Sequence, residues 1–136
     1  MLQKTLAIIK PDAVKAKNSG KIIDRIESEG FKILKLEKMQ LTKAQAEQFY
    51  AVHKGKPFFD ELVEFMTSGP IVVMVLEKNN AIEDWRNLMG ATDPAKAENN
   101  TIRKLFGSSK GENATHGSDA PETAAQEIKI FFPKLN

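Results

Sequence analysis

The chain has 136 residues, 41% of them hydrophobic and 28% charged, and carries a net charge of +2. This size and balance predict a single globular domain over residues 1–136 and exclude a disordered chain. The absence of cysteine excludes disulfides and thiolate metal sites, and no apolar run is long enough to span a membrane, so we expect a cytoplasmic protein.

The first part of the chain predicts a strand, a helix and a second strand. The apolar run Thr5–Ile9 is typical of a buried strand, and Pro11 places a turn after it. A helix is expected to begin at Ser19 and to end at Gly30, with its isoleucines on one face. The partial alternation of Phe31–Leu36 predicts the second strand.

Two helices and a third strand are predicted next. Thr42–Gln45 has the pattern of a capping box, which predicts a helix through Tyr50. A further helix is predicted from Pro57 through Met66, because its apolar residues recur at helical spacing. Ile71–Leu76 is apolar on both faces and is expected to be a central strand.

Helices and a loop are predicted after this strand. A helix capped by Asn80 is expected to end at Gly90, and shorter helical segments are expected after Asp93 and over Thr101–Phe106. The stretch 107–117 is polar and carries glycines, so it predicts a loop.

The last segment predicts a short helix capped at Asp119 and a final strand over Ile128–Phe132. This order of elements predicts an α+β fold, a ferredoxin-like split β-α-β sandwich. We expect a four-stranded, mostly antiparallel sheet with helices packed on one face.

Candidate chemistry lies in the second half of the chain. The sequence has no P-loop, no G-x-G-x-x-G and no G-x-S-x-G nucleophile elbow. His116 ends a polar loop beside Gly117, a setting that suits an approaching anion, although an ordinary surface histidine is an equally good interpretation. Ser118 and Asp119 follow too closely along the chain to form a catalytic relay with it. His53 lies among lysines and is expected to be solvated.

Only three of the 20 basic residues are arginines, the preferred side chains for binding phosphate. Arg25 has an acidic partner one helical turn away, at Glu29, and is expected to be a surface residue. Arg86 and Arg103 have no acid four residues away. Each alone is compatible with a surface role, but the two together with a nearby histidine indicate a phosphate site.

Two adjacent phenylalanines, Phe58 and Phe59, stand at the start of a predicted helix, where only one can point fully into the core. The other is either packed against a neighbour, which is the more common role, or exposed as a platform on which a base can stack.

Several strings together carry a resemblance to a known family. The most specific is Asn113–Asp119. The others are Thr5–Val14, Gly20–Ile22, His53–Phe59, Ser68–Pro70, Leu88–Pro94 and Thr101–Arg103. With all of them in this order, the chain closely resembles the nucleoside diphosphate kinase family almost end to end. The resemblance implies an enzyme that transfers the γ-phosphoryl of a nucleoside triphosphate, mainly ATP, to nucleoside diphosphates.

The resemblance also implies how each site residue acts. It implies a ping-pong mechanism through a phosphohistidine at His116, with broad base specificity. Glu127 matches the carboxylate that bonds the other ring nitrogen; its alternative is a solvated residue that begins the last strand. The other implied catalytic residues are Lys10, Tyr50 and Ser118. The implied nucleotide-binding residues are Lys10, Phe58, Arg86, Thr92, Arg103 and Asn113.

Magnesium is the implied cofactor, held mainly by nucleotide phosphates, with Asp119 assisting through water. The chain departs from the family at Asn100, where glycine is usual, and at Ala120, where serine is usual. Asparagine tolerates positive φ, so the turn at Asn100 is expected to survive. The resemblance implies a homo-oligomer, with a tetramer preferred over a hexamer.

Two other interpretations stay open. One is a catalytically silent relative that only binds nucleotides. The other is a nucleic-acid-binding module of the same topology, which would need an aromatic RNP1-type strand that Gly30–Ile33 does not supply. Because the lysines are scattered among acids, we expect neither a nucleic acid nor a membrane as partner.

Overall fold

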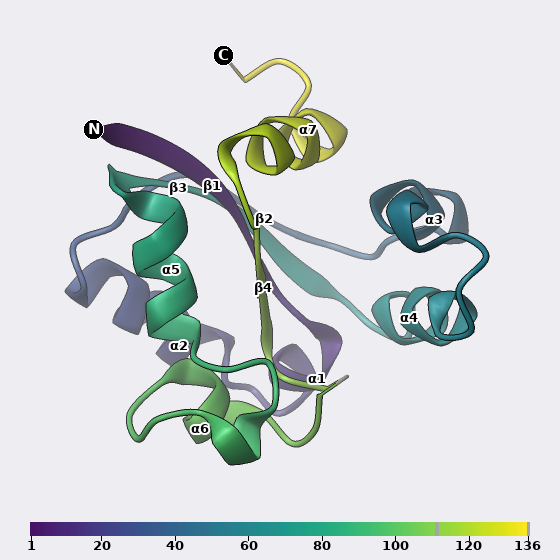
Figure 1. The fold of residues 1–136 in the computed structure, drawn as a ribbon, viewed down its shortest axis with the longest axis horizontal. Coiled ribbons are helices and arrows are strands. Elements are labelled where there is room, and N and C mark those ends of the chain that lie inside the picture. Colours follow the sequence, from purple (N-terminus) through teal and green to yellow (C-terminus); the bar gives the residue numbers. More distant parts are fainter. Residues whose placement is uncertain (111, 136) are drawn as a thin grey trace.

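The computed structural model describes residues 1–110 and 112–135, which form one sheet with helices packed against it (Figure 1). Its strands are β1 (Leu2–Ile9), β2 (Lys32–Met39), β3 (Ile71–Asn79) and β4 (Thr115–Gly117). They lie in the order β2-β3-β1-β4, and each neighbouring pair is antiparallel. This order confirms the predicted ferredoxin-like α+β fold and the central position of β3.

The helices agree with most of the predicted segments. Thr42 and Gln45 form the expected capping box, with Thr42 Oγ1 accepting from the Gln45 N–H at 3.1 Å. Asn80 and Asp119, in contrast, cap no helix through their side chains. No helix in the described ranges has both the length and the apolar character needed to cross a membrane. The helices are α1 (Pro11–Lys15), α2 (Ser19–Ser28), α3 (Lys43–Phe49), α4 (Phe59–Met66), α5 (Ala81–Met89), α6 (Ile102–Phe106) and α7 (Pro121–Phe131).

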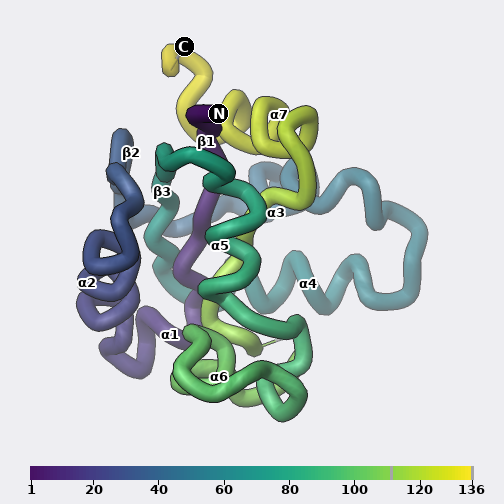
Figure 2. The backbone as a smooth tube through the Cα atoms, turned by 60° about the vertical axis from the view of Figure 1, so that its left-hand side comes forward, coloured from purple at the N-terminus to yellow at the C-terminus, as the bar shows by residue number. Residues whose placement is uncertain are grey.

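The sheet is covered on both faces, so the expectation of helices on one face is wrong. Ala7 and Ile9 lie in a core shared with α2 and α5, whereas Leu6 and Ile8 lie in a core shared with α3, α4 and α7. Figure 2 shows α2 and the α3–α4 pair on opposite sides of the sheet. The reason is that β1 and β3 are apolar on both faces, and each face has to be removed from water.

The C-terminal part differs from the prediction in two ways. The expected loop 107–117 contains β4. The expected strand Ile128–Phe132 is not a strand, because all but its last residue belongs to α7. Ala124 and Ile128, four residues apart, are both buried, which is the spacing of one helical face. β4 pairs with β1 over only three residues, too few for a recognisable alternation in the sequence.

Three turns have the left-handed backbone that their residue types favour. Gly30 and Gly90, which follow α2 and α5, have φ values of 91° and 89°. Asn100 has a φ of 70°. The turn before α6 therefore has the positive φ that asparagine tolerates, as expected.

Candidate active site

His116 lies in the middle of β4, opposite Ile8 of β1. The segment is fixed from behind by Trp85 of α5, whose Nε1 donates to the His116 carbonyl oxygen at 3.1 Å. Gly117 permits this contact, because a Cβ at that position would lie 2.5 Å from Trp85 Cδ1. His116 is therefore held on a strand rather than in the loop expected from the sequence.

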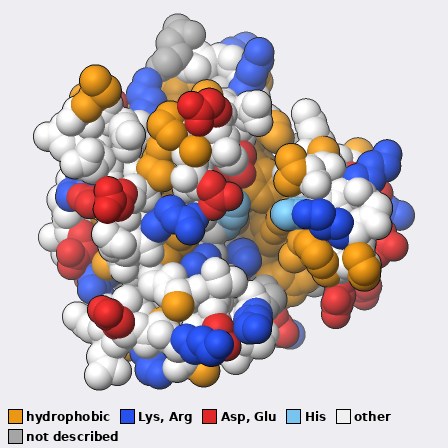
Figure 3. Space-filling model, viewed as in Figure 1, with side chains coloured by type: hydrophobic (Ala, Val, Ile, Leu, Met, Phe, Trp, Pro, Cys, Tyr) orange, Lys and Arg blue, Asp and Glu red, His pale blue; other side chains and the backbone are white. Residues whose placement is uncertain are grey.

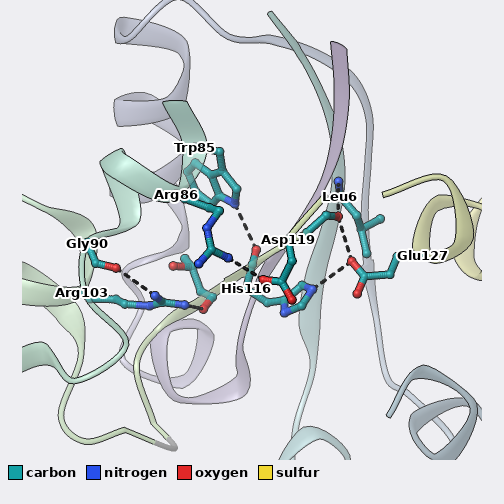
Figure 4. A network of polar contacts seen from close by, with 10 residues as sticks. Leu6, Trp85, Arg86, Gly90, Arg103, His116, Asp119 and Glu127 are labelled. Carbon is teal, nitrogen blue, oxygen red and sulfur yellow. Dashed lines mark hydrogen bonds and ion pairs between the residues drawn. The ribbon is translucent and has the colours of Figure 1, made fainter. Parts of the chain in front are cut away.

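The imidazole of His116 has one bonded and one free nitrogen (Figure 4). Its Nε2 lies 3.1 Å from Glu127 Oε1, and Phe49 packs edge-on against the ring at 4.9 Å between centroids. Within residues 1–110 and 112–135, no group forms a hydrogen bond with Nδ1. Since a carboxylate accepts hydrogen bonds, the neutral ring carries its proton on Nε2 and its lone pair on Nδ1.

Glu127 is itself held in place. Ser118 Oγ donates to Glu127 Oε1 at 2.8 Å and accepts from the Leu6 N–H of β1 at 3.2 Å. The Glu127 side chain is only 13% exposed and belongs to α7. Its alternative as a solvated residue that begins a last strand is therefore wrong. Ser118 contacts the carboxylate rather than the imidazole.

Three cations, Arg103, Arg86 and Lys10, lie in the region around this histidine. Arg103 Nη1 and Nη2 donate to the backbone carbonyls of Gly90 and Thr115 at 2.9 and 3.1 Å, and its buried Nε has no partner within the described residues. Burial and the charge of Arg86 lower the pKa of Arg103 to about 10. Burial and the charge of Arg103 lower the pKa of Lys10 to about 8. Cations held this close together favour a bound anion.

Arg86 and Asp119 form an ion pair across the opening of this region. Both side chains are exposed, and their pairing joins α5 to the segment before α7. Figure 3 shows Lys and Arg side chains gathered around the hollow between the α3–α4 pair and the rest of the molecule. Asp119 could not be expected as the partner of Arg86, because the two residues are 33 positions apart in the sequence.

A chain of hydrogen bonds leads from Lys10 toward an open cleft. Lys10 Nζ donates to Asn113 Oδ1 at 2.8 Å, and Asn113 Nδ2 donates to the Thr92 carbonyl oxygen at 3.0 Å. Thr92 and Phe58 both line a cleft of ≈ 690 Å³ between α4 and the loop before β4. Phe58 is 43% exposed and Phe59 is buried, so one of the two points outward, as the sequence analysis expected.

Two further aromatic rings, of Tyr50 and His53, lie in contact between Phe49 and Phe58. Tyr50 is buried, and burial together with the charge of Glu127 raises the pKa of its hydroxyl. That hydroxyl forms no hydrogen bond with the described residues. His53 is half-buried, 5.2 Å from the Phe58 ring between centroids. The structure thus brings most of the expected site residues together in one region, with Phe58 and Thr92 on its outer side.

Sequence analysis missed three residues that shape the site. No role in a site was expected for Phe49, Trp85 or Asp12. In the structure, Asp12 Oδ2 accepts from the Ala114 N–H at 3.0 Å. All three act through contacts between distant segments, and no local pattern indicates them.

The similarity to known proteins agrees with this arrangement. The family described as "Nucleoside diphosphate kinase" matches residues 3–136. A protein of that name from Persephonella marina is 56% identical over 98% of this chain and 96% of its own length. The solved nucleoside diphosphate kinase of Aquifex aeolicus matches with a TM-score of 0.95 and 47% identity, over 97% of this chain and 96% of that one. A halophilic nucleoside diphosphate kinase from Halobacterium salinarum, solved in complex with CDP, matches with a TM-score of 0.93 and 40% identity, over 97% and 88%.

Proposed function

The chain belongs to the nucleoside diphosphate kinase family of nucleotide phosphotransferases, and on that premise we propose that it works by a ping-pong mechanism through a phosphohistidine at His116. The observation that carries the proposal is the state of the imidazole. Its Nε2 is tied to Glu127, while Nδ1 has a lone pair and no partner among the described residues. This is the arrangement of an oriented, neutral nucleophile.

In the first half-reaction, the Nδ1 lone pair attacks the γ-phosphorus of a nucleoside triphosphate. The bond from that phosphorus to the bridging oxygen breaks, and the nucleoside diphosphate leaves with the electron pair. The ring becomes cationic as it is phosphorylated, and Glu127 stabilises this charge through Nε2–H. In the second half-reaction, a terminal oxygen of a second diphosphate takes the phosphoryl group and the neutral ring returns.

The cations supply electrostatic stabilisation of the transferring phosphoryl group. We assign Arg103, Arg86 and Lys10 to phosphate oxygens, since charge accumulates on these oxygens in the transition state. Asn113 and Thr92 are assigned to the sugar and the phosphates. Tyr50 lines the site next to the reacting ring.

Phe58 is assigned to the nucleobase, which stacks on its exposed face in the cleft shared with Thr92. Every base has a π-face, so stacking supports transfer among nucleotides of all bases. The Halobacterium salinarum relative binds CDP, a pyrimidine nucleotide, which is compatible with this tolerance.

Magnesium fits this site as an ion carried by the nucleotide. In the described ranges, no group of three or more His, Cys, Asp or Glu side chains is placed to hold a metal. The exposed Asp119 carboxylate lies at the opening with its Oδ1 paired to Arg86, so we assign its other oxygen to the ion through water, with phosphate oxygens as the main ligands. Bound there, the ion would neutralise charge on the phosphates.

Steady-state kinetics test the proposal directly. With ATP as donor and GDP, CDP or dTDP as acceptor, double-reciprocal plots at several fixed ATP concentrations are expected to be parallel, because the first product leaves before the acceptor binds. All three acceptors should be used. Intersecting lines would indicate a ternary complex and contradict the phosphohistidine.

Nucleotide binding is expected to weaken as the pH rises through about 8, where Lys10 loses its charge. In that range ADP binding should take up protons, because phosphate restores the ammonium form. The free energy of unfolding of the ligand-free protein depends on pH with the opposite sign. An unfolded lysine keeps its proton to about 10.5, so above about 8 the unfolded chain binds more protons than the folded one, and the contribution of Lys10 to stability rises with pH. Calorimetric titrations of ADP at pH 8.5 in two buffers of different ionisation enthalpy measure the uptake.

The matched variants for this test are Lys10→Gln and Lys21→Gln, the second at an exposed lysine of α2. Lys21→Gln should retain the proton uptake and Lys10→Gln should lose it. Equal uptake in both would assign the proton to another group.

We extend the proposal to a homo-oligomer, with a tetramer preferred over a hexamer. Its support is the position of β2, which forms an edge of the sheet and exposes Leu36. The cytoplasmic location stays a prediction.

A further inference from the structure

The loop that leads into β4 contains a residue in an unfavourable backbone conformation. Ala114 is fully buried and has a φ of 74°, in the left-handed region that residues with a Cβ seldom adopt. It stands two residues before His116. A strained residue at such a place persists only where its surroundings hold it.

Both backbone polar groups of Ala114 are held by one short segment, Lys10–Asp12. The Lys10 N–H donates to the Ala114 carbonyl oxygen at 2.8 Å, and the Ala114 N–H donates to Asp12 Oδ2 at 3.0 Å. Pro11, between them, has a ring-restricted φ and begins α1. The two segments therefore form a closed clasp around Ala114, in which the Asp12 carboxylate supplies the side-chain acceptor for the Ala114 N–H.

The same segment carries the Lys10 ammonium into the site. Lys10 Nζ donates to Asn113 Oδ1 at 2.8 Å, and Asn113 directly precedes Ala114. The clasp thus sets the position of the ammonium relative to the strand that carries His116.

We propose that Asp12 is a positioning residue, which closes this clasp through its hydrogen bond to Ala114 and places its carboxylate on the same short segment as the Lys10 ammonium. The proposal rests on the proposed function, in which Lys10 binds phosphate and His116 accepts the phosphoryl group. It gives Asp12 two separable roles, because the hydrogen bond needs only an acceptor oxygen, whereas the effect on Lys10 needs a negative charge.

The charges around Lys10 support the second role. Burial and the charge of Arg103 of α6 lower the pKa of Lys10, whereas the charge of Asp12 of α1 raises it. These two residues are the charged groups that shift this pKa. Burial raises the pKa of Asp12 itself, while the bond from Ala114 and the charge of Lys10 oppose that rise. Removal of the Asp12 charge should therefore lower the pKa of Lys10 further.

Two substitutions separate the roles. Asp12→Asn keeps an acceptor oxygen for the Ala114 N–H and loses the charge, whereas Asp12→Ala loses both. Asp24→Asn and Asp24→Ala, at an exposed aspartate of α2, are the matched controls. For each variant, kcat and kcat/KM are measured from pH 6.5 to 9.5, together with ADP affinity over the same range and urea unfolding.

Asp12→Ala is expected to lower kcat by about tenfold to a hundredfold, because the His116 strand is no longer fixed relative to Lys10. Asp12→Asn should retain most of the kcat of the unsubstituted protein, because it keeps an acceptor for the Ala114 N–H. In both variants the alkaline fall of kcat/KM and of ADP affinity should begin about half a pH unit or more below that of the unsubstituted protein. The Asp24 variants should leave both profiles unchanged.

Two results would overturn the proposal. One is a kcat in Asp12→Asn as low as in Asp12→Ala; the other is a uniform loss across the pH range with no displacement of the alkaline limb. The measurement of ADP affinity does not depend on the phosphohistidine. Even if the enzyme formed no such intermediate, a displaced alkaline fall of ADP affinity would still report on Asp12 and Lys10. If Asp12→Ala unfolds, the ADP profile of Asp12→Asn decides alone.

Discussion

Replacement of His116 with alanine is expected to abolish the uptake of label from [γ-³²P]ATP and to slow transfer to GDP by at least about a thousandfold. The variant lacks Nδ1, the atom that we assign as nucleophile, and among the described residues no other imidazole is bonded to Glu127. In the unsubstituted protein, the label should be labile to acid and stable to base, as expected of a phosphorus–nitrogen bond on histidine.

His53→Ala is the matched control, because it removes the chain's only other histidine. That side chain lies in the turn Ala51–His53 and its Nδ1 is 3.4 Å from Lys56 Nζ. The variant should take up label to the same stoichiometry as the unsubstituted protein. Label that persists in His116→Ala, or disappears in His53→Ala, would refute the assignment.

Replacement of Arg103 with alanine is expected to reduce kcat/KM by about a hundredfold or more, the usual effect of losing one preorganised electrostatic partner of a transition state. The half-buried guanidinium bonds the carbonyls of Gly90 and Thr115, and its buried Nε is left without a partner among the described residues. Because these two bonds go to neutral groups, the charge of Arg103 is available to a ligand.

Arg25→Ala is the control for this experiment. Arg25 is paired with Glu29 at 3.0 Å on the surface of α2, and its loss should change kcat/KM by less than about twofold. Arg103 also donates to two backbone carbonyls, so Arg103→Ala will lower the stability of the protein as well. Rates are therefore compared without denaturant, at a temperature well below the unfolding midpoint of the variant. Arg103→Lys keeps the charge and loses the two-pronged geometry, and should recover only part of the rate. Equal effects of Arg25→Ala and Arg103→Ala would remove Arg103 from the phosphate site.

Strong local patterns were sufficient for much of the fold. The capping box at Thr42 predicted α3, and the run Ile71–Leu76, which is apolar on both faces, predicted the centre of the sheet. Each pattern is made of residues close together in the sequence, so it could be read without knowledge of the fold. The strand that carries His116 was missed, since three residues are held there by pairing with β1 and by Trp85 rather than by their own preferences. The strand predicted over Ile128–Phe132 was wrong for the opposite reason. A run rich in isoleucine and phenylalanine favours a strand, but α7 buries Ala124 and Ile128 on one face and packs against β1, which selects a helix.

The candidate site shows the same division. Arg86 and Arg103 could be singled out by residue type and by the absence of a local acid, and the family resemblance supplied the positions of Lys10 and Glu127. The partners could not be inferred, because Asp119 meets Arg86, and Asp12 meets Ala114, only after the chain has folded. Contacts between distant segments depend on the whole topology, so a local pattern carries no information on them.

The indole of Trp85 is the chain's only one, and it is fully buried with its N–H bonded to the carbonyl of His116. The emission of an indole responds to the hydrogen bond that its N–H donates and to charge placed close by. A phosphoryl group on His116 adds negative charge to the very residue that this chromophore contacts. Under the proposed mechanism, the emission of Trp85 should therefore change in each half-reaction, so that both could be followed without an attached dye.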